Sequence, residues 1–219
     1  GKWMHLFLAR QPHADAFAHL HPTRTQGNHE FATTLPMLPA GRYWLFADVT
    51  HESGFAETYT GEVDLAQGTV APAQNSDPDD SWLNEEPQGS IKIERISSAT
   101  VKAGNEVTLT FRVLDSENQP ATVEFYMGMP AHAMILRQDA TVFTHLHPLG
   151  TISMAAQQVF AKRDQSGAQL SSWDVLCGKP SSDLQFPYAF PKAGRYRVWV
   201  QAKAAGKIVT APFDFQVSD

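Results

Sequence analysis

A six-residue phrase built around His-x-His occurs twice in this chain, and it limits the possible folds more than any other feature. FAHLHP spans Phe17–Pro22 and FTHLHP spans Phe143–Pro148. Further matching segments flank both copies in the same order: MHLFLARQ and AHAMILRQ before them, LPAGRYWLFADV and FPKAGRYRVWVQA after them. Self-similarity of this kind indicates two copies of one structural unit.

The offset between the copies grows along the chain. It is 132 − 5 = 127 at the pair His5 and His132, and 194 − 41 = 153 at the pair Gly41 and Gly194. The second copy therefore carries an insertion of 153 − 127 = 26 residues. The polar, turn-rich stretch near 161–185 is the natural place for it, and we predict a long surface loop there.

The segments around these matches are typical of β-strands. IKIERIS, NEVTLTFRVLD and ATVEFYMG are short β-rich runs separated by turn residues, and no segment has a sustained helical stripe of apolar residues. We expect an all-β protein made of two tandem Ig-like β-sandwich domains, with little helix. In the repeated Ala-Gly-Arg-Tyr phrase, Tyr43 and Tyr196 are expected to anchor a corner of each domain.

The expected domains are 1–68 and 90–219, joined by a linker at 69–89 that is rich in proline and acidic residues. The second copy has two or three predicted strands before its first matched segment, whereas the first copy has none. We therefore expect the first repeat to be incomplete at its N-terminus. Its open sheet edge would be completed by another segment or by homodimerisation.

Each copy is predicted to place three histidines on one face of a β-hairpin. If the second hairpin turns near 139–140, His132 lies opposite His147, and Met134 lies opposite His145. Residues i and i+2 of a strand share a face, and opposed side chains have Cβ atoms ~4.5–5.5 Å apart. The four side chains would therefore lie together.

The same construction in the first copy opposes His5 to His21 and Phe7 to His19. A single histidine is more often a packed residue than a ligand, but matching positions in both copies favour metal ligation. Three imidazoles bind zinc or copper and leave one position open. The sequence therefore predicts a metal site in each repeat, formed by His5, His19 and His21 and by His132, His145 and His147.

Two further side chains are candidate ligands. Met134 would add a thioether to the second site, and thioether beside imidazole favours copper, Cu(I) in particular, over zinc. His29 of the first copy lies near the position of Met154 in the second copy, so either could complete its own site. Copper, as Cu(I) or Cu(II), is the expected metal, and zinc is the alternative.

Other classes of function find little support in the sequence. The formal net charge is −6, and Lys and Arg are scattered, which argues against a nucleic-acid partner. The sequence contains no carboxylate pair, phosphate-binding loop or Gly-Ser nucleophile motif, so we name no catalytic residue and do not favour an enzyme. Cys177 is the only cysteine, and no internal disulfide can form.

The phrase H…FxHLHP, followed by AGRY and alternating apolar residues, resembles bacterial extracytoplasmic Ig-like modules of the YtkA-like and FixH-like type. More distantly, it is similar to CopC-like copper-binding sandwiches. The resemblance covers Lys2–Leu65 and Ile91–Val217. It implies a β-sandwich at the periplasmic or extracellular face of a bacterial membrane, with a membrane-tethered or transport protein as partner.

One departure limits what this resemblance transfers. CopC-like proteins bind copper through the mature N-terminal amine and a nearby histidine, whereas this chain opens with Gly1 and Lys2. No ligand is therefore carried over, and any copper site would be the hairpin one. The resulting hypothesis is a metal-binding protein of storage, delivery or resistance. The alternative is a structural or sensory ectodomain that makes protein contacts without metal.

Overall fold

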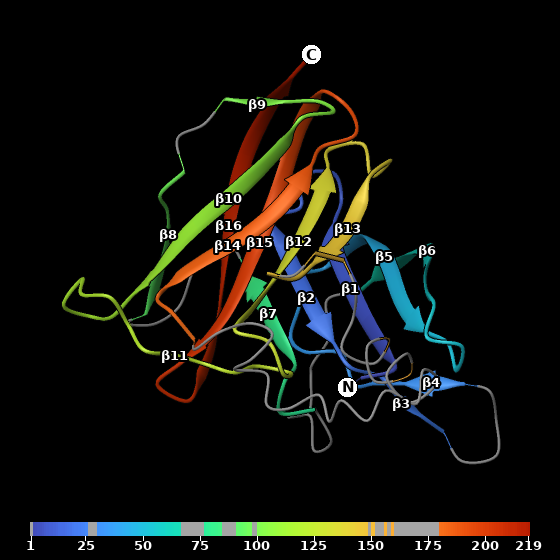
Figure 1. Ribbon diagram of the computed structural model, residues 1–219. Coiled ribbons are helices and arrows are strands. Elements are labelled where there is room, and N and C mark those ends of the chain that lie inside the picture. Colours follow the sequence, from blue (N-terminus) through green and yellow to red (C-terminus); the bar gives the residue numbers. More distant parts are fainter. Residues whose placement is uncertain are drawn as a thin grey trace.

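The structure is a computed structural model, and it describes residues 2–25, 30–66, 77–84, 91–97, 100–148, 150–151, 156, 159 and 180–219. Every named element of this described part is a β-strand (Figure 1). The predicted all-β, sandwich-like fold with little helix is thus confirmed. No helix among the described residues is long and apolar enough to cross a membrane.

The N-terminal half forms a five-stranded sheet, called here the first sheet, in the order β6-β5-β1-β2-β7. Its strands are β1 (Met4–Arg10), β2 (Ala16–Leu20), β5 (Gly41–Thr50), β6 (Ala56–Leu65) and β7 (Ser81–Asn84). The short strands β3 (Thr23–Arg24) and β4 (Phe31–Ala32) pair separately. Strand β7 comes from the segment predicted as a linker and pairs with β2.

The C-terminal half forms two sheets. The middle sheet has the order β13-β12-β15-β16-β9, with β11 paired to β15, and the outer sheet has the order β14-β10-β8. The middle-sheet strands are β9 (Val101–Lys102), β11 (Val123–Glu124), β12 (Ala131–Arg137), β13 (Phe143–Leu146), β15 (Gly194–Ala204) and β16 (Lys207–Ser218). The outer-sheet strands are β8 (Lys92–Arg95), β10 (Glu106–Leu114) and β14 (Asp183–Ala189).

The predicted insertion at 161–185 falls mainly on residues outside the described part of the chain. The described residues resume at 180, and Asp183 already begins strand β14, which pairs with β10. Cys177, His29 and Met154 also lie outside the described residues.

The middle sheet is buried on both faces, which makes the fold three layers of sheet (Figure 1). In β12, Ala133 and Ile135 pack into the core shared with the outer sheet. The alternate residues Met134 and Leu136 pack against Phe7 and other residues of the first sheet. Burial on both faces explains the nearly continuous apolar run of this strand.

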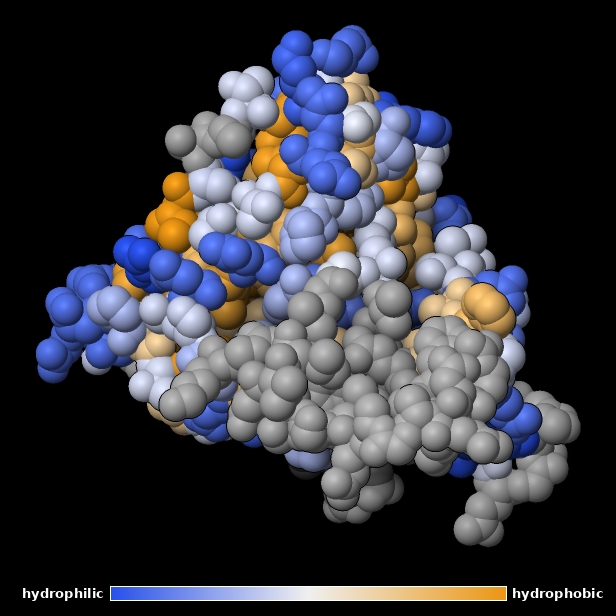
Figure 2. All heavy atoms as spheres, in the orientation of Figure 1, coloured by the Kyte–Doolittle hydropathy of each residue, from blue (hydrophilic) through white to orange (hydrophobic). Residues whose placement is uncertain are grey.

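On the face shown in Figure 2, hydrophilic side chains predominate, with hydrophobic ones between them.

The central strands of the first sheet, β1 and β2, are covered on both faces as well. The face that carries Leu8, Leu20 and Tyr43 packs against Leu35 and Leu38 of the segment before β5. The opposite face packs on the middle sheet. Leu8 corresponds to Ile135 of the second half, which packs toward the outer sheet, so the segment before β5 covers the face of the first sheet that the outer sheet covers in the second half.

The predicted hairpin registers are confirmed. Phe7 lies opposite His19 in the β1–β2 pair. Met134 lies opposite His145 in the β12–β13 pair. The two corner tyrosines are confirmed as well, because the hydroxyl of Tyr43 donates to the carbonyl of Pro39 and that of Tyr196 donates to the carbonyl of Lys192, each at 2.7 Å.

The contact between the first and middle sheets predicts a large effect of Trp199→Ala. Trp199 is 1% exposed and stacks on Phe17 with ring centroids 4.3 Å apart. Its removal should lower the free energy of unfolding by about 3–5 kcal/mol. Urea unfolding followed by circular dichroism measures this loss. Trp82→Ala is the control, because Trp82 is 47% exposed, and its loss should stay below about 1 kcal/mol. Equal losses in the two variants would contradict the packing described above.

Candidate metal centre

Six histidines lie in the interface between the first and middle sheets. Strand alternation places His5 on the same face of β1 as Phe7, and His132 on the same face of β12 as Met134. All six side chains are buried: His5, His19, His21, His132, His145 and His147. One part of this interface is therefore apolar, and the neighbouring part is made of imidazoles.

Within each group of three, the imidazole nitrogens are close enough to share one metal ion. In both triads, one nitrogen from each ring lies within 4.8 Å of the others. His5 Nδ1 lies 2.9 Å from His19 Nε2, and His132 Nδ1 lies 3.3 Å from His145 Nε2. Tetrahedral coordination with metal–nitrogen bonds of ~2.0–2.1 Å places neighbouring nitrogens about 3.3 Å apart. Both triads could therefore hold a metal ion.

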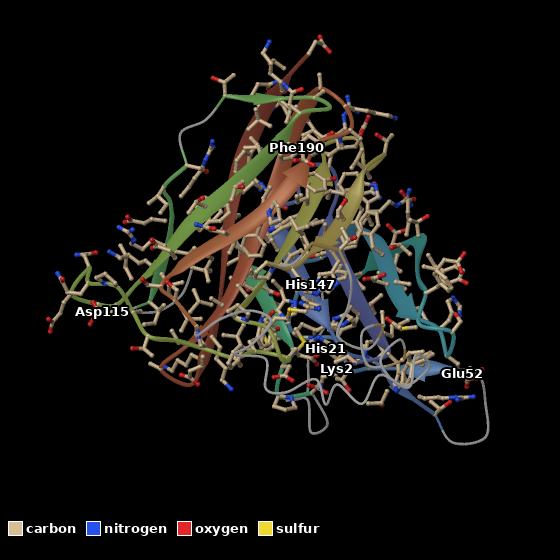
Figure 3. The ribbon with its side chains drawn as sticks, in the orientation of Figure 1. Lys2, His21, Glu52, Asp115, His147 and Phe190 are labelled. Carbon is tan, nitrogen blue, oxygen red and sulfur yellow. The ribbon has the colours of Figure 1, made fainter. Side chains whose placement is uncertain are left out.

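The two triads lie against each other and form a single six-histidine cluster. The ring centroids of His5 and His145 are 4.7 Å apart, and those of His19 and His132 are 6.2 Å apart. Figure 3 shows His21 and His147 at the same end of the layered sheets. The sequence predicted a separate site in each repeat, and it carried no signal for this juxtaposition.

The central histidine of each triad is held by a side chain from the other half of the chain. His19 Nδ1 donates to Gln201 Oε1 at 2.7 Å, and His145 Nδ1 donates to Asp48 Oδ2 at 3.2 Å. Such acceptors orient a ligating imidazole and select its tautomer. Sequence reasoning missed both acceptors. They nevertheless occupy equivalent positions of the two copies, because 201 − 48 = 153 is also the offset between the two AGRY phrases.

Gln201 is itself held in one orientation. Its amide nitrogen donates to the hydroxyl groups of Ser81 and of Thr210, the latter at 2.9 Å. Its oxygen is therefore left to accept the hydrogen bond from His19.

Two further histidines of the cluster, His21 and His132, also have partners that sequence reasoning missed. His21 Nδ1 donates to Asp80 Oδ1 at 3.0 Å. His132 Nε2 donates to the backbone carbonyl of Tyr126 at 3.0 Å. Asp80 precedes β7, within the predicted linker, so this segment contributes to the cluster.

Two acidic residues lie near His21, and Lys2 links one of them to a third. Asp77 and Asp80 lie within 4.8 Å of His21, measured between possible ligand atoms. The ammonium group of Lys2 lies 2.6 Å from Asp77 and 3.4 Å from Asp79. The positive charge of Lys2 therefore lies beside Asp77 and Asp79, whereas Asp80 accepts the hydrogen bond from His21.

Within the described part of the chain, two buried ring nitrogens have no hydrogen-bond partner, His21 Nε2 and His147 Nδ1. They belong to the last histidine of each repeated HLHP phrase, one in each triad. A buried polar atom without a partner is costly and needs an explanation. A buried imidazole nitrogen without a partner, in a residue grouped with two other histidines, fits a metal ligand.

The second triad contains a conflict that hydrogen bonding alone does not resolve. A neutral imidazole has one N–H, and carbonyl and carboxylate oxygens only accept. His132 uses its N–H on Tyr126, and His145 uses its N–H on Asp48. Their remaining nitrogens therefore both carry lone pairs and face each other at 3.3 Å. A cation between them relieves this repulsion.

Protons are poor candidates for that cation near neutral pH. Burial, with the positive charges of neighbouring histidines, holds the pKa of His5, His19, His132 and His145 well below the ordinary value. Burial also lowers the pKa of His147 to about 4. These five imidazoles are therefore neutral at pH 7 and offer lone pairs to a metal ion.

Of the other predicted ligands, Met134 has a defined place. It is fully buried and lies opposite His145 in the hairpin. It also packs in the apolar cluster with Phe7, Leu136 and Trp199. Met134 thus borders the second triad where the imidazoles meet the apolar residues.

Comparison with known proteins adds one assignment. The sequence model of a family described as a domain of unknown function (DUF8832) matches residues 89–219. The chain belongs to this family. The DUF8832 match contains the second triad and Gln201, whereas the first triad and Asp48 precede it. A search of curated proteins finds no match.

The buried neutral histidines predict that the metal-free protein loses stability in mild acid. Their pKa values in the folded protein lie below 6.5, so the unfolded chain binds more protons as the pH falls below that value. Each such histidine contributes a slope of about 1.4 kcal/mol per pH unit. Burial raises the pKa of Asp48 to about 6, which offsets a small part of this loss.

We expect the free energy of unfolding to fall by on the order of 5 kcal/mol between pH 7.5 and pH 5.5. Urea unfolding of metal-free protein at the two pH values measures the change. The variant His13→Ala with His51→Ala should retain it, because both side chains are exposed. A stability that does not change over this range would contradict the burial of neutral imidazoles.

Proposed function

We propose that this protein binds copper in its six-histidine cluster and serves in metal storage, delivery or resistance. The supporting observation is the pair of opposed lone pairs on His132 and His145, next to the unpartnered Nδ1 of His147. Apolar packing alone gives no reason to bury such a set. A metal ion satisfies all three nitrogens at once.

The donor set favours copper over other metals. Imidazole nitrogens suit both copper and zinc, and a divalent copper ion binds such ligands more tightly than zinc does. The thioether of Met134 borders the second triad and adds a soft group that favours Cu(I). Zinc is the alternative, because it binds the same imidazoles.

The setting of this function is proposed from the sequence resemblance alone. The YtkA-like, FixH-like and CopC-like proteins that the repeated phrases resemble act outside the cytoplasm of bacteria. We therefore propose action at the periplasmic or extracellular face of a membrane. A membrane-tethered or transport protein would supply or receive the metal.

The test is metal titration of protein purified without a metal-affinity column. Cu(I), Cu(II) and Zn(II) are titrated separately at pH 7.5, with Cu(I) measured by competition against a chromophoric chelator. The variant His21→Ala with His147→Ala removes one unpartnered nitrogen from each triad. We expect tight binding by the unmodified chain and a loss of about a hundredfold or more in the variant, because each triad keeps only two ligands.

His13→Ala with His51→Ala is the matched control, since it also removes two histidines but leaves the cluster intact. Circular dichroism reports whether each variant is folded. Unmodified protein that binds no metal below micromolar concentration would overturn the proposal. It would favour an ectodomain that makes protein contacts without metal.

A further inference from the structure

The six-histidine cluster has a charge balance that limits what it can hold. Among the described residues, two carboxylates are hydrogen-bonded to its rings, Asp48 to His145 and Asp80 to His21. Their side chains are 15% and 2% exposed. An imidazole that binds a metal ion through a lone pair is neutral, so six such ligands with the two carboxylates carry two negative charges in a largely buried place. A buried charge needs a compensating charge.

Two singly charged ions, or one divalent ion, would balance this charge. Two divalent ions would leave an excess of two positive charges. The nearby acids Asp77 and Asp79 share the single positive charge of Lys2, so together they add at most one further negative charge, which does not balance two divalent ions.

The distance between the triads makes this limit strong. The nearest rings of opposite triads have centroids 4.7–6.2 Å apart, so the two triads are adjacent, and ions bound in both would repel each other. At about 6 Å and an effective dielectric constant of about 20, two unit charges weaken the second binding event about a hundredfold. Between two divalent ions the repulsion energy is four times larger, so the second binding event is weakened by roughly the fourth power of that factor.

Hydrogen bonding distinguishes the two triads. In the first triad, His19 uses its N–H on Gln201, and its free nitrogen accepts from His5 Nδ1 at 2.9 Å. This arrangement is satisfied without metal, and a metal ion bound there must displace the proton between the rings. In the second triad, both facing nitrogens already carry lone pairs. A metal ion enters it without moving a proton.

We propose that the six-histidine cluster is one coupled centre that binds its first ion in the His132–His145–His147 triad. It then admits a second ion, in the His5–His19–His21 triad, only when both ions carry a single charge. The centre therefore holds two Cu(I) ions or one divalent ion. This inference rests on the proposed function and gives it a selectivity for monovalent copper.

The first experiment compares the stoichiometry of Cu(I) and Zn(II) on the unmodified chain at pH 7.5. We expect two Cu(I) and one Zn(II), with any second Zn(II) at least ~1000-fold weaker. Two Zn(II) ions bound within tenfold of each other, or only one Cu(I), would overturn the coupling while metal binding itself stands. No binding of either metal would overturn the proposed function, and the coupling with it.

The second experiment assigns the single Zn(II) ion with two matched variants. His21→Ala should retain its affinity within about threefold, whereas His147→Ala should lose about a hundredfold or more. Equal losses would show that both triads share one ion, and a larger loss in His21→Ala would reverse the order of filling. Either result would overturn the inference.

His21→Gln and His147→Gln are the substitutes where an alanine variant does not fold.

Asp80→Asn supplies an independent readout, because it removes one negative charge and no histidine. It should weaken the second Cu(I) about tenfold or more and leave the single Zn(II) in place. An unchanged second Cu(I) would overturn the charge balance.

Discussion

The packing of the first sheet on the middle sheet is the interaction on which the rest of this structure depends. Part of that interface is apolar, with Phe17 stacked on Trp199 and Phe46 stacked on Phe143. The neighbouring part buries six imidazoles, which costs free energy because polar groups leave water. The aromatic contacts hold the sheets together and so make the burial of the histidines possible. A metal ion bound in the cluster would add to that stability through its affinity for the folded state.

Each half of the chain also orients the histidines of the other half. Asp48 lies beside His5 in the first sheet but accepts a hydrogen bond from His145 of the middle sheet. Gln201 lies beside His132 but accepts from His19. The exchange means that neither triad has its full set of partners within one half. It would also link metal binding to the contact between the two halves, because Asp48 and Gln201 each orient a histidine of the opposite half.

Local patterns were sufficient to predict the hairpins but not their assembly. The spacing of His145 from Met134 and of His19 from Phe7 determines which residues face each other, because strand alternation is a local property. The tyrosine corners followed from the repeated AGRY phrase for the same reason. The role of Asp80 could not be predicted, because its segment is polar and rich in proline, and pairing with a distant strand alone gives it a place beside His21.

The sequence by itself determined the all-β architecture, the two hairpin registers and the identity of the six candidate ligands. Alternation and repetition encode these features without reference to distant parts of the chain. Only the tertiary structure decided that the two triads meet in one cluster and that Asp48 and Gln201 exchange partners across it. Which face of one sheet packs on which face of another depends on the summed burial of side chains from both halves, and no local pattern contains that sum.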